Sequence, residues 1–158
     1  LIVAGKSLAG LQQMGELFKK RTLKKYYLCI VKGRITEPAH IRGYLVKDEK
    51  TNRVSLSKGG FSKDAKGLPI ETEYVPIAWN EEMTLLKVHL ITGRTHQIRV
   101  HMESLGHPVV GDKKYGARTN PMKRLGLHAS TLAFIHPATG ELVRFSAPVP
   151  KAFLLYSK

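Results

Sequence analysis

The sequence predicts an α+β fold: a mostly antiparallel β-sheet flanked by a few helices. Three observations predict this class. Strand-like segments dominate the chain, pairs of them are linked as hairpins, and helical segments are few. With 158 residues, of which 42% are hydrophobic, the chain is long enough to bury a substantial core. We therefore expect residues 1–158 to form a single domain.

The first part of the chain predicts a strand, a helix and a second strand. Residues 1–4 are an apolar run typical of a short buried strand. Ser7 is a good N-cap for a helix whose apolar residues recur at helical spacing as far as Phe18, with lysines near its end. Residues 26–31 are rich in β-branched and aromatic side chains and stop at Gly33, which predicts a strand.

Two hairpins are expected next. The first joins residues 41–46 to residues 53–57 through a polar tip, and the second joins residues 70–79 to residues 83–91. Between the hairpins, residues 58–68 contain three glycines and three lysines, a composition that predicts a loop.

A helix should follow the second hairpin. Residues 92–94 break the strand, Thr95 can cap a helix over residues 96–105, and Gly106 can end it. Three apolar residues share one face that should pack against the sheet: Ile98, Met102 and Leu105. The rest of the chain predicts a loop at 107–121, strands at 127–135 and 142–145, and a short helix at 152–156.

The charge of the chain favours a polyanionic partner. Lys and Arg number 26 against 12 Asp and Glu, giving a formal net charge of +14, and nucleic acid is the commonest polyanion. A basic protein whose lysines serve only solubility is the alternative. No segment approaches the length of a membrane span and no terminus resembles a signal peptide. The single cysteine, Cys29, lies in an apolar strand segment and should be buried; a reducing cytoplasm is the expected compartment.

The densest polar cluster lies around Gly93, which allows a sharp turn or a close approach to a ligand. Arg94, Arg99 and the start of the next helix form a positive focus suited to a phosphate or to a carboxylate that must stay ionised. Two alternatives remain open from spacing alone. Arg99 could pair with Glu103 one helical turn later, and Arg94 could be a solvated turn residue.

The histidines do not have metal-binding spacing. His96 and His101 are five residues apart, so they point to different sides of a helix, and we expect no metal site. General acid–base cleavage of RNA by a pair of histidines stays open as an alternative.

A basic loop follows the polar cluster and suits an RNA backbone, with one aromatic ring on which a base could stack. Its expected RNA-binding residues are Lys113, Lys114, Tyr115, Arg118, Lys123 and Arg124. A solvated charged loop is the alternative. Tyr26 and Tyr27 point to opposite faces of their strand, so one should be core and the other available to a ligand.

Three blocks in this order resemble the RluA family of RNA pseudouridine synthases. They are Thr-Gly-Arg-Thr-His-Gln-Ile-Arg-Val-His at 92–101, Gly-His-Pro at 106–108 and Gly-Asp-Lys-Lys-Tyr-Gly at 111–116. Lys-Tyr-Tyr-Leu-Cys-Ile-Val-Lys-Gly at 25–33 resembles the family's Lys-x-Tyr strand motif, and the segments at 127–129 and 136–141 resemble its C-terminal strands.

The resemblance implies a pseudouridine synthase fold and an isomerase that converts uridine to pseudouridine in structured ribosomal or transfer RNA. The family uses no cofactor and no metal, and it flips the target uridine out of its stack. The expected partner is structured RNA, and no association with a membrane is expected. The protein is also expected to be a monomer.

The resemblance also carries residue roles. Tyr27 matches the tyrosine that packs on the target base and is implicated in proton removal from C5, and Arg99 matches the basic residue that pairs with the catalytic carboxylate. Ile98 resembles the aliphatic residue beneath the base. Arg94, His96 and Gln97 are expected to line the substrate site, without an individual step assigned.

The sequence departs from the family at the nucleophile, an aspartate in a His-Arg-Leu-Asp-like motif that precedes a strand. Residues 1–7 resemble the end of that strand, so the motif is expected a few residues before Leu1. Asp48 and Asp64 lie in polar loops and Asp112 belongs to another motif. We therefore expect an N-terminally incomplete catalytic domain that binds RNA but is inactive alone, with Arg99 lacking its anion at a cost of several kcal/mol. A non-catalytic basic RNA-binding domain is the alternative.

Overall fold

The structure is a computed structural model that describes residues 1–57 and 67–156. Its strands are β1 (Lys24–Lys32), β2 (Ala39–Asp48), β3 (Arg53–Leu56), β4 (Leu68–Trp79), β5 (Met83–Leu90), β6 (Leu127–Ile135) and β7 (Leu142–Ser146). Its helices are α1 (Leu8–Lys20), α2 (Gln97–Ser104) and α3 (Lys151–Tyr156), with a 3₁₀ turn, η1 (Lys113–Tyr115). The strands form one antiparallel seven-stranded sheet in the order β3-β2-β4-β5-β1-β6-β7, which confirms the expected fold class.

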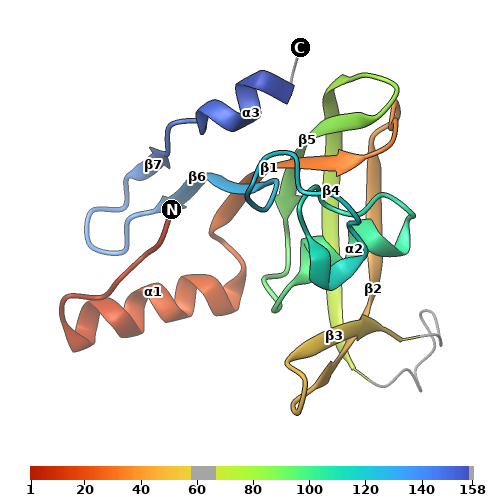
Figure 1. Ribbon diagram of the computed structural model, residues 1–158. Coiled ribbons are helices and arrows are strands. Elements are labelled where there is room, and N and C mark those ends of the chain that lie inside the picture. Colours follow the sequence, from red (N-terminus) through yellow and green to blue (C-terminus); the bar gives the residue numbers. More distant parts are fainter. Residues whose placement is uncertain (58–66, 157–158) are drawn as a thin grey trace.

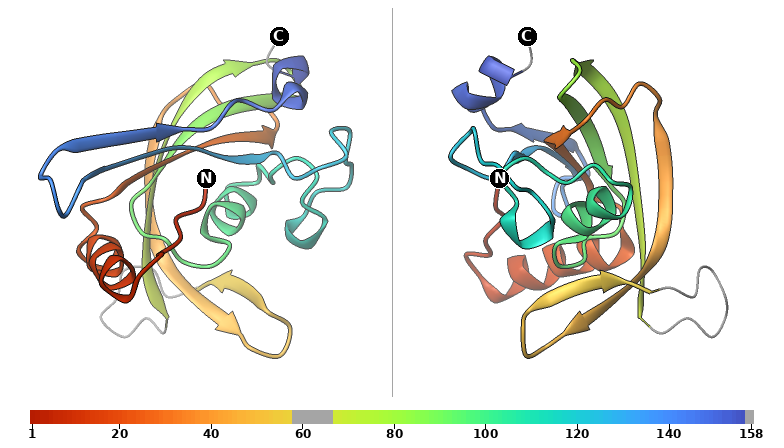
Figure 2. Two further views of the ribbon diagram at one scale, coloured as in Figure 1. Left: turned by 90° about the vertical axis from the view of Figure 1, so that its left-hand side faces the viewer. Right: turned by 45° about the vertical axis from the view of Figure 1, so that its right-hand side comes forward.

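The sheet is strongly twisted. Figures 1 and 2 show β2, β4 and β5 standing together, while β6 and β7 run across them at a steep angle. The hairpins β2–β3, β4–β5 and β6–β7 are those expected from the sequence. Strand β1 lies between β5 and β6, which both come later in the chain, and no hairpin turn announces these pairings.

The centre of the sheet is buried on both faces. Residues 29–31 of β1 are each 0% exposed, and Cys29 is a core residue as expected. Ile98 and Met102 of α2 pack on one face. Phe153 of α3 packs against Ile30 on the other face. Because α2 lies on the sheet in this way, its first turn is held against the end of β5.

Helix α1 is the helix that the sequence predicts. The Ser7 hydroxyl accepts a hydrogen bond from the backbone N–H of Gly10 at 3.1 Å, and the helix ends at Arg21 in the left-handed conformation (φ 57°). Met14 and Leu17 pack against a cluster formed by β6 and its neighbours, but no residue of α1 is fully buried.

Three sequence expectations need correction or limits. Residues 1–4 form no strand: Ile2 is 95% exposed, and the Leu1 nitrogen donates one hydrogen bond to the Ala129 carbonyl at 3.2 Å. Leu105 is 40% exposed and lies one residue beyond the end of α2, so it is not part of the apolar face of the helix. The loop expected at 58–68 lies outside the described residues except for Gly67 and Leu68, and Leu68 begins β4.

Among residues 1–57 and 67–156, no helix combines the length and the apolar character needed to cross a bilayer.

Candidate active site

The residues singled out by the sequence meet in one cavity of about 270 Å³, where the first turn of α2 faces β1 and the start of β6. Its lining residues are Tyr27, Leu90, Arg94, His96, Gln97, Ile98, Arg99, Leu125 and Leu127. We call it the Tyr27 cavity. It contains both residues expected to be catalytic and all four expected to bind substrate. The three leucines were not predicted, since apolar residues in strands and loops carry no signal that separates a site wall from core.

A register shift in the pairing of β1 with β6 falls between Tyr26 and Tyr27. Both rings are half-buried, so neither is the fully buried core residue that strand alternation predicts. Tyr26 stacks on His89 with ring centroids 4.9 Å apart, and Tyr27 lines the cavity. Burial raises the pKa of Tyr27, so its side chain is a neutral phenol at neutral pH.

The turn before α2 is held by Gln97 rather than by the expected Thr95 cap. The Gln97 Oε1 accepts hydrogen bonds from Thr92 Oγ1 at 2.7 Å and from the Arg94 backbone N–H at 3.1 Å. Its Nε2 donates to the Glu71 carbonyl and to Thr72 Oγ1, both at 2.9 Å. The amide of Gln97 therefore makes four bonds within the protein, and its contribution to the cavity is to fix the turn.

His96 begins α2 in the left-handed conformation (φ 55°) and makes no capping bond with its side chain. Its Nδ1 lies 2.8 Å from the Tyr115 hydroxyl, which accepts a bond from the Val54 N–H at 3.1 Å. The hydroxyl is left to donate to Nδ1, which puts the ring proton on Nε2. Burial and the charge of Arg99 lower the pKa of His96 and favour this neutral ring.

Arg99 is not without an anion, and it does not pair with Glu103. Its Nε and Nη2 donate to the two carboxylate oxygens of Asp112 at 2.6 and 2.8 Å. The Asp112 bonds raise the pKa of Arg99, and its guanidinium lies 4.8 Å from the Tyr115 ring centre. Glu103 instead lies 3.7 Å from Arg53. The expected penalty for an unpaired Arg99 is therefore wrong.

Asp112 is the functional neighbour that sequence reasoning missed. Its side chain is 1% exposed, and it also accepts from the Tyr115 backbone N–H at 3.2 Å. Thirteen residues separate it from Arg99, and no helical or strand period links them. The available signal was composition, because Asp112 is the sole carboxylate in the stretch 107–121. After Asp112 is satisfied, no described residue accepts a hydrogen bond from Arg99 Nη1.

The basic loop lies outside the Tyr27 cavity, and one of its expected roles is wrong. The Tyr115 ring is 0% exposed, so it offers no face to a base. Lys114 donates to the Asn52 carbonyl at 2.6 Å, and the Arg124 guanidinium lies 5.4 Å from the Phe153 ring centre. The remaining cations of the loop are exposed: Lys113, Arg118 and Lys123.

A histidine pair is not assembled at this site. All seven histidines lie in the described part of the chain, and His96 alone lines the Tyr27 cavity. His101 is buried with its Nδ1 bonded to Thr72 Oγ1 at 2.8 Å, and burial lowers its pKa to about 4. Within residues 1–57 and 67–156, no group of three His, Cys, Asp or Glu side chains is placed to hold a metal ion.

The fold defines the class of protein. The chain superposes on the human protein "RNA Pseudouridylate Synthase Domain Containing 1" with a TM-score of 0.74 and 29% identity, over 92% of this chain and 62% of that one. The human protein "RNA Pseudouridylate Synthase Domain Containing 4" gives a TM-score of 0.75 over 96% of this chain and 67% of that one; at 23% identity this likeness concerns the fold alone. The fold is thus that of a pseudouridylate synthase domain.

Sequence comparison gives the family. Residues 1–104 match the family described as RNA pseudouridylate synthase, and the chain belongs to this family, in its RluA group. It is 36% identical to "Uncharacterized RNA pseudouridine synthase YhcT" of Bacillus subtilis over 87% of this chain and 44% of the relative. It is 33% identical to "Ribosomal large subunit pseudouridine synthase C" of Pasteurella multocida over 94% of this chain and 47% of the relative. The chain therefore spans about half the length of the curated relatives it matches.

Proposed function

We propose that the protein isomerises uridine to pseudouridine in structured RNA, either ribosomal or transfer RNA. The bond between N1 and the sugar C1′ breaks, a bond between C5 and C1′ forms, the proton leaves C5, and N1 gains a proton. The mass of the RNA is unchanged and no cofactor or metal is required. The printed names of relatives, among them "Ribosomal large subunit pseudouridine synthase D" of Nitrosomonas europaea, favour ribosomal RNA.

The meeting of Tyr27, Ile98 and Arg99 in one cavity carries this proposal. The Tyr27 ring offers a face on which a flipped uracil can pack, and Ile98 offers an apolar surface beneath it. Tyr27 then lies in position to take part in proton removal from C5. Arg94 and His96 bind the nucleotide at the edge of the cavity, and Gln97 keeps the turn in place.

Arg99 holds the nucleophilic aspartate in its ionised form in this proposal. Its Nε edge is occupied by Asp112, while both protons of Nη1 remain available to a second carboxylate. Among the described residues, Asp112 does not line the cavity, and Asp48 lies at the β2–β3 tip, bonded to the Lys50 N–H at 2.9 Å. Asp64 lies outside the described residues, in a segment whose sequence predicts a polar loop. We therefore propose that residues 1–158 bind RNA but do not isomerise uridine by themselves.

Loss of tritium from C5 of uridine tests the reaction, because C5 keeps its hydrogen unless it is joined to the sugar. A transcript made with 5-tritiated uridine is incubated with the natural protein, meaning residues 1–158 together with any residues that precede Leu1. The same assay is run on three variants: Tyr27→Phe, Arg99→Ala and Tyr26→Phe. Tyr27→Phe and Arg99→Ala should lower turnover by about 100-fold or more. Tyr26→Phe is the matched control, since Tyr26 lines a different cavity, and it should stay close to the unchanged protein.

Three outcomes would contradict the proposal. RNA binding without tritium release by the natural protein would favour a non-catalytic RNA-binding domain. Shortened RNA would favour a hydrolase. Tritium release by the 158-residue chain alone would show that the assignment of the nucleophile is wrong.

A further inference from the structure

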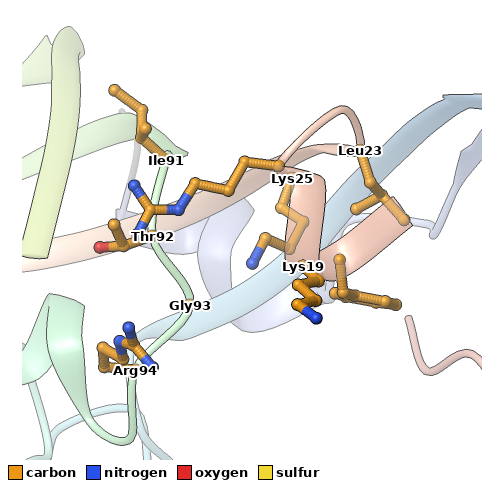
Figure 3. A pocket seen from close by; sticks show the side chains of 9 residues that line it. Lys19, Leu23, Lys25, Ile91, Thr92, Gly93 and Arg94 are labelled. Carbon is orange, nitrogen blue, oxygen red and sulfur yellow. The ribbon is translucent and has the colours of Figure 1, made fainter. Parts of the chain in front are cut away.

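A second cavity lies where the end of α1 and the start of β1 face the turn at residues 92–94. Its volume is about 330 Å³. The lining residues are Phe18, Lys19, Arg21, Leu23, Lys25, Ile91, Thr92, Gly93 and Arg94. In the view of Figure 3, Lys25 reaches toward Gly93 from one side, with Lys19 on that same side, and Arg94 lies on the other. We call this the Lys25 cavity.

The charge of the Lys25 cavity is uncompensated. Four of its nine lining residues are cations, and none is acidic. In the part of the chain that the structure describes, Lys19, Arg21 and Lys25 make no ion pair with a carboxylate, and neither does Arg94. Like charges gathered in a concave site repel one another and concentrate a positive potential, which a bound anion relieves.

Among the four cations of the Lys25 cavity, Lys25 is the one that is half-buried. Its Nζ lies so close to the turn that a Cβ added at Gly93 would clash with it. The ammonium also lies 5.6 Å from the Phe18 ring centre. Burial, followed by the nearby charge of Arg21, lowers the pKa of Lys25, as expected for a half-buried cation with no anion beside it.

We propose that the Lys25 cavity is a phosphodiester subsite that holds a backbone phosphate of the RNA next to the flipped uridine. This inference rests on the proposed function, because it assigns RNA as the source of the anion. Arg94 lines both the Tyr27 cavity and the Lys25 cavity, so the two adjoin at one side chain. A nucleotide in the first therefore leads its neighbouring phosphate to the second, and the phosphate contact sets the register without reading sequence.

The test measures binding of a short stem–loop RNA with one loop uridine, by fluorescence anisotropy over a range of KCl concentrations. Lys25→Gln should weaken binding about tenfold or more at low salt and lower the salt slope by about one phosphate contact. Arg21→Asn is a second variant, because Asn tolerates the left-handed backbone of Arg21. Lys151→Gln is the matched control: it removes the same charge from an exposed position on α3. Melting temperatures establish that each variant is folded.

Replacing one phosphodiester of the RNA at a time by a neutral linkage shows which phosphate the Lys25 cavity holds. A set of RNAs is made, each with one methylphosphonate near the loop uridine. In the unchanged protein one linkage should weaken binding more than the others, and in Lys25→Gln this penalty should disappear. Equal effects of Lys25→Gln and Lys151→Gln, or a linkage penalty that persists in both Lys25→Gln and Arg21→Asn, would overturn the subsite.

Tritium release separates the two proposals. RNA binding with the linkage effect but no isomerisation contradicts the proposed function alone. Isomerisation without the linkage effect contradicts the subsite alone.

Discussion

Asp112 holds one edge of the Arg99 guanidinium, and no described residue accepts a hydrogen bond from Nη1. Asp112 takes its Nε and Nη2, and the Tyr115 ring lies against it. This arrangement fixes the plane of the guanidinium, so that Nη1 can meet a second anion in a set direction. The buried carboxylate of Asp112 is thus a positioning group for Arg99.

Asp112→Asn should destabilise the fold by about 3–5 kcal/mol, because it leaves a partly buried cation without its ionised partner. Urea denaturation measures the change in the free energy of unfolding. Glu103→Gln is the control, since it removes a half-buried carboxylate 3.7 Å from the exposed Arg53 and should cost less than about 1 kcal/mol. Equal costs for the two variants would show that the Arg99–Asp112 pair has no special role.

His101 should make the stability depend on pH. Burial lowers its pKa to about 4 from 6.5, so in this range the unfolded chain binds a proton that the folded protein does not. The free energy of unfolding should therefore fall as the pH drops from about 6.5 to about 4, by about 3 kcal/mol in total from this group. His101→Asn keeps an acceptor for Thr72 Oγ1 and removes the titration.

Denaturation at several pH values compares the two proteins. The pH dependence of the His101→Asn variant should be shallower by that amount, whatever its absolute stability. Parallel curves for both proteins would contradict the assignment.

The sequence predicts which residues line the Tyr27 cavity better than it predicts their hydrogen-bond and ion-pair partners. Tyr27, Ile98 and Arg99 come from motifs, and the fold brings them together. The partner of Arg99 could not be predicted, because helical spacing offers Glu103 and only the path of a loop brings Asp112 within reach. Tyr115 shows the same limit: a tyrosine among lysines suggests a surface ring, yet it is buried beneath the cations around it.

Helix α2 depends on a side chain in its own first turn. With no cap from Thr95 and a left-handed residue at His96, the four bonds of Gln97 link this turn to β4 and to the residues that follow β5. Capping rules scan the residues before a helix, so they identify Thr95 and overlook Gln97.

Gln97→Glu should reveal this dependence. The change replaces two donated bonds by an acceptor facing the Glu71 carbonyl and Thr72 Oγ1, and it should cost about 3 kcal/mol or more in the free energy of unfolding. The cost should shrink in acid, where a protonated Glu can donate one bond. Gln12→Glu on exposed α1 is the control, with an expected change within about 0.5 kcal/mol. Near-equal stabilities of the two variants would contradict a structural role for Gln97.

At the scale of the molecule, the hairpins were predictable and the assembly of the sheet was not. Short turns and alternating residues announce β2–β3, β4–β5 and β6–β7. The places of β1 beside β5 and β6 depend on contacts far apart in sequence, and local patterns do not contain them. Residues 1–4 failed as a strand for the related reason that apolar sequence does not supply a pairing edge.

The net charge of +14 predicts RNA binding that weakens steeply with salt. Lys113 is exposed on η1, so Lys113→Ala should weaken binding and lower the slope of log K against log salt by about one phosphate contact. Anisotropy titrations at several KCl concentrations measure both effects, with Lys151→Ala as control. A slope equal to that of the unchanged protein would contradict a role of the basic loop in the RNA-binding surface.

The central place of β1 constrains how the chain acquires its structure during synthesis. Its residues leave the ribosome ahead of both strands that flank it, and β6 ends more than one hundred residues after β1 ends. Until Leu127–Ile135 has emerged, the apolar residues at 29–31 lack one of their two neighbouring strands and remain partly exposed to solvent. The nascent chain should therefore remain protease-sensitive until β6 is translated, and then gain resistance in one late, cooperative step.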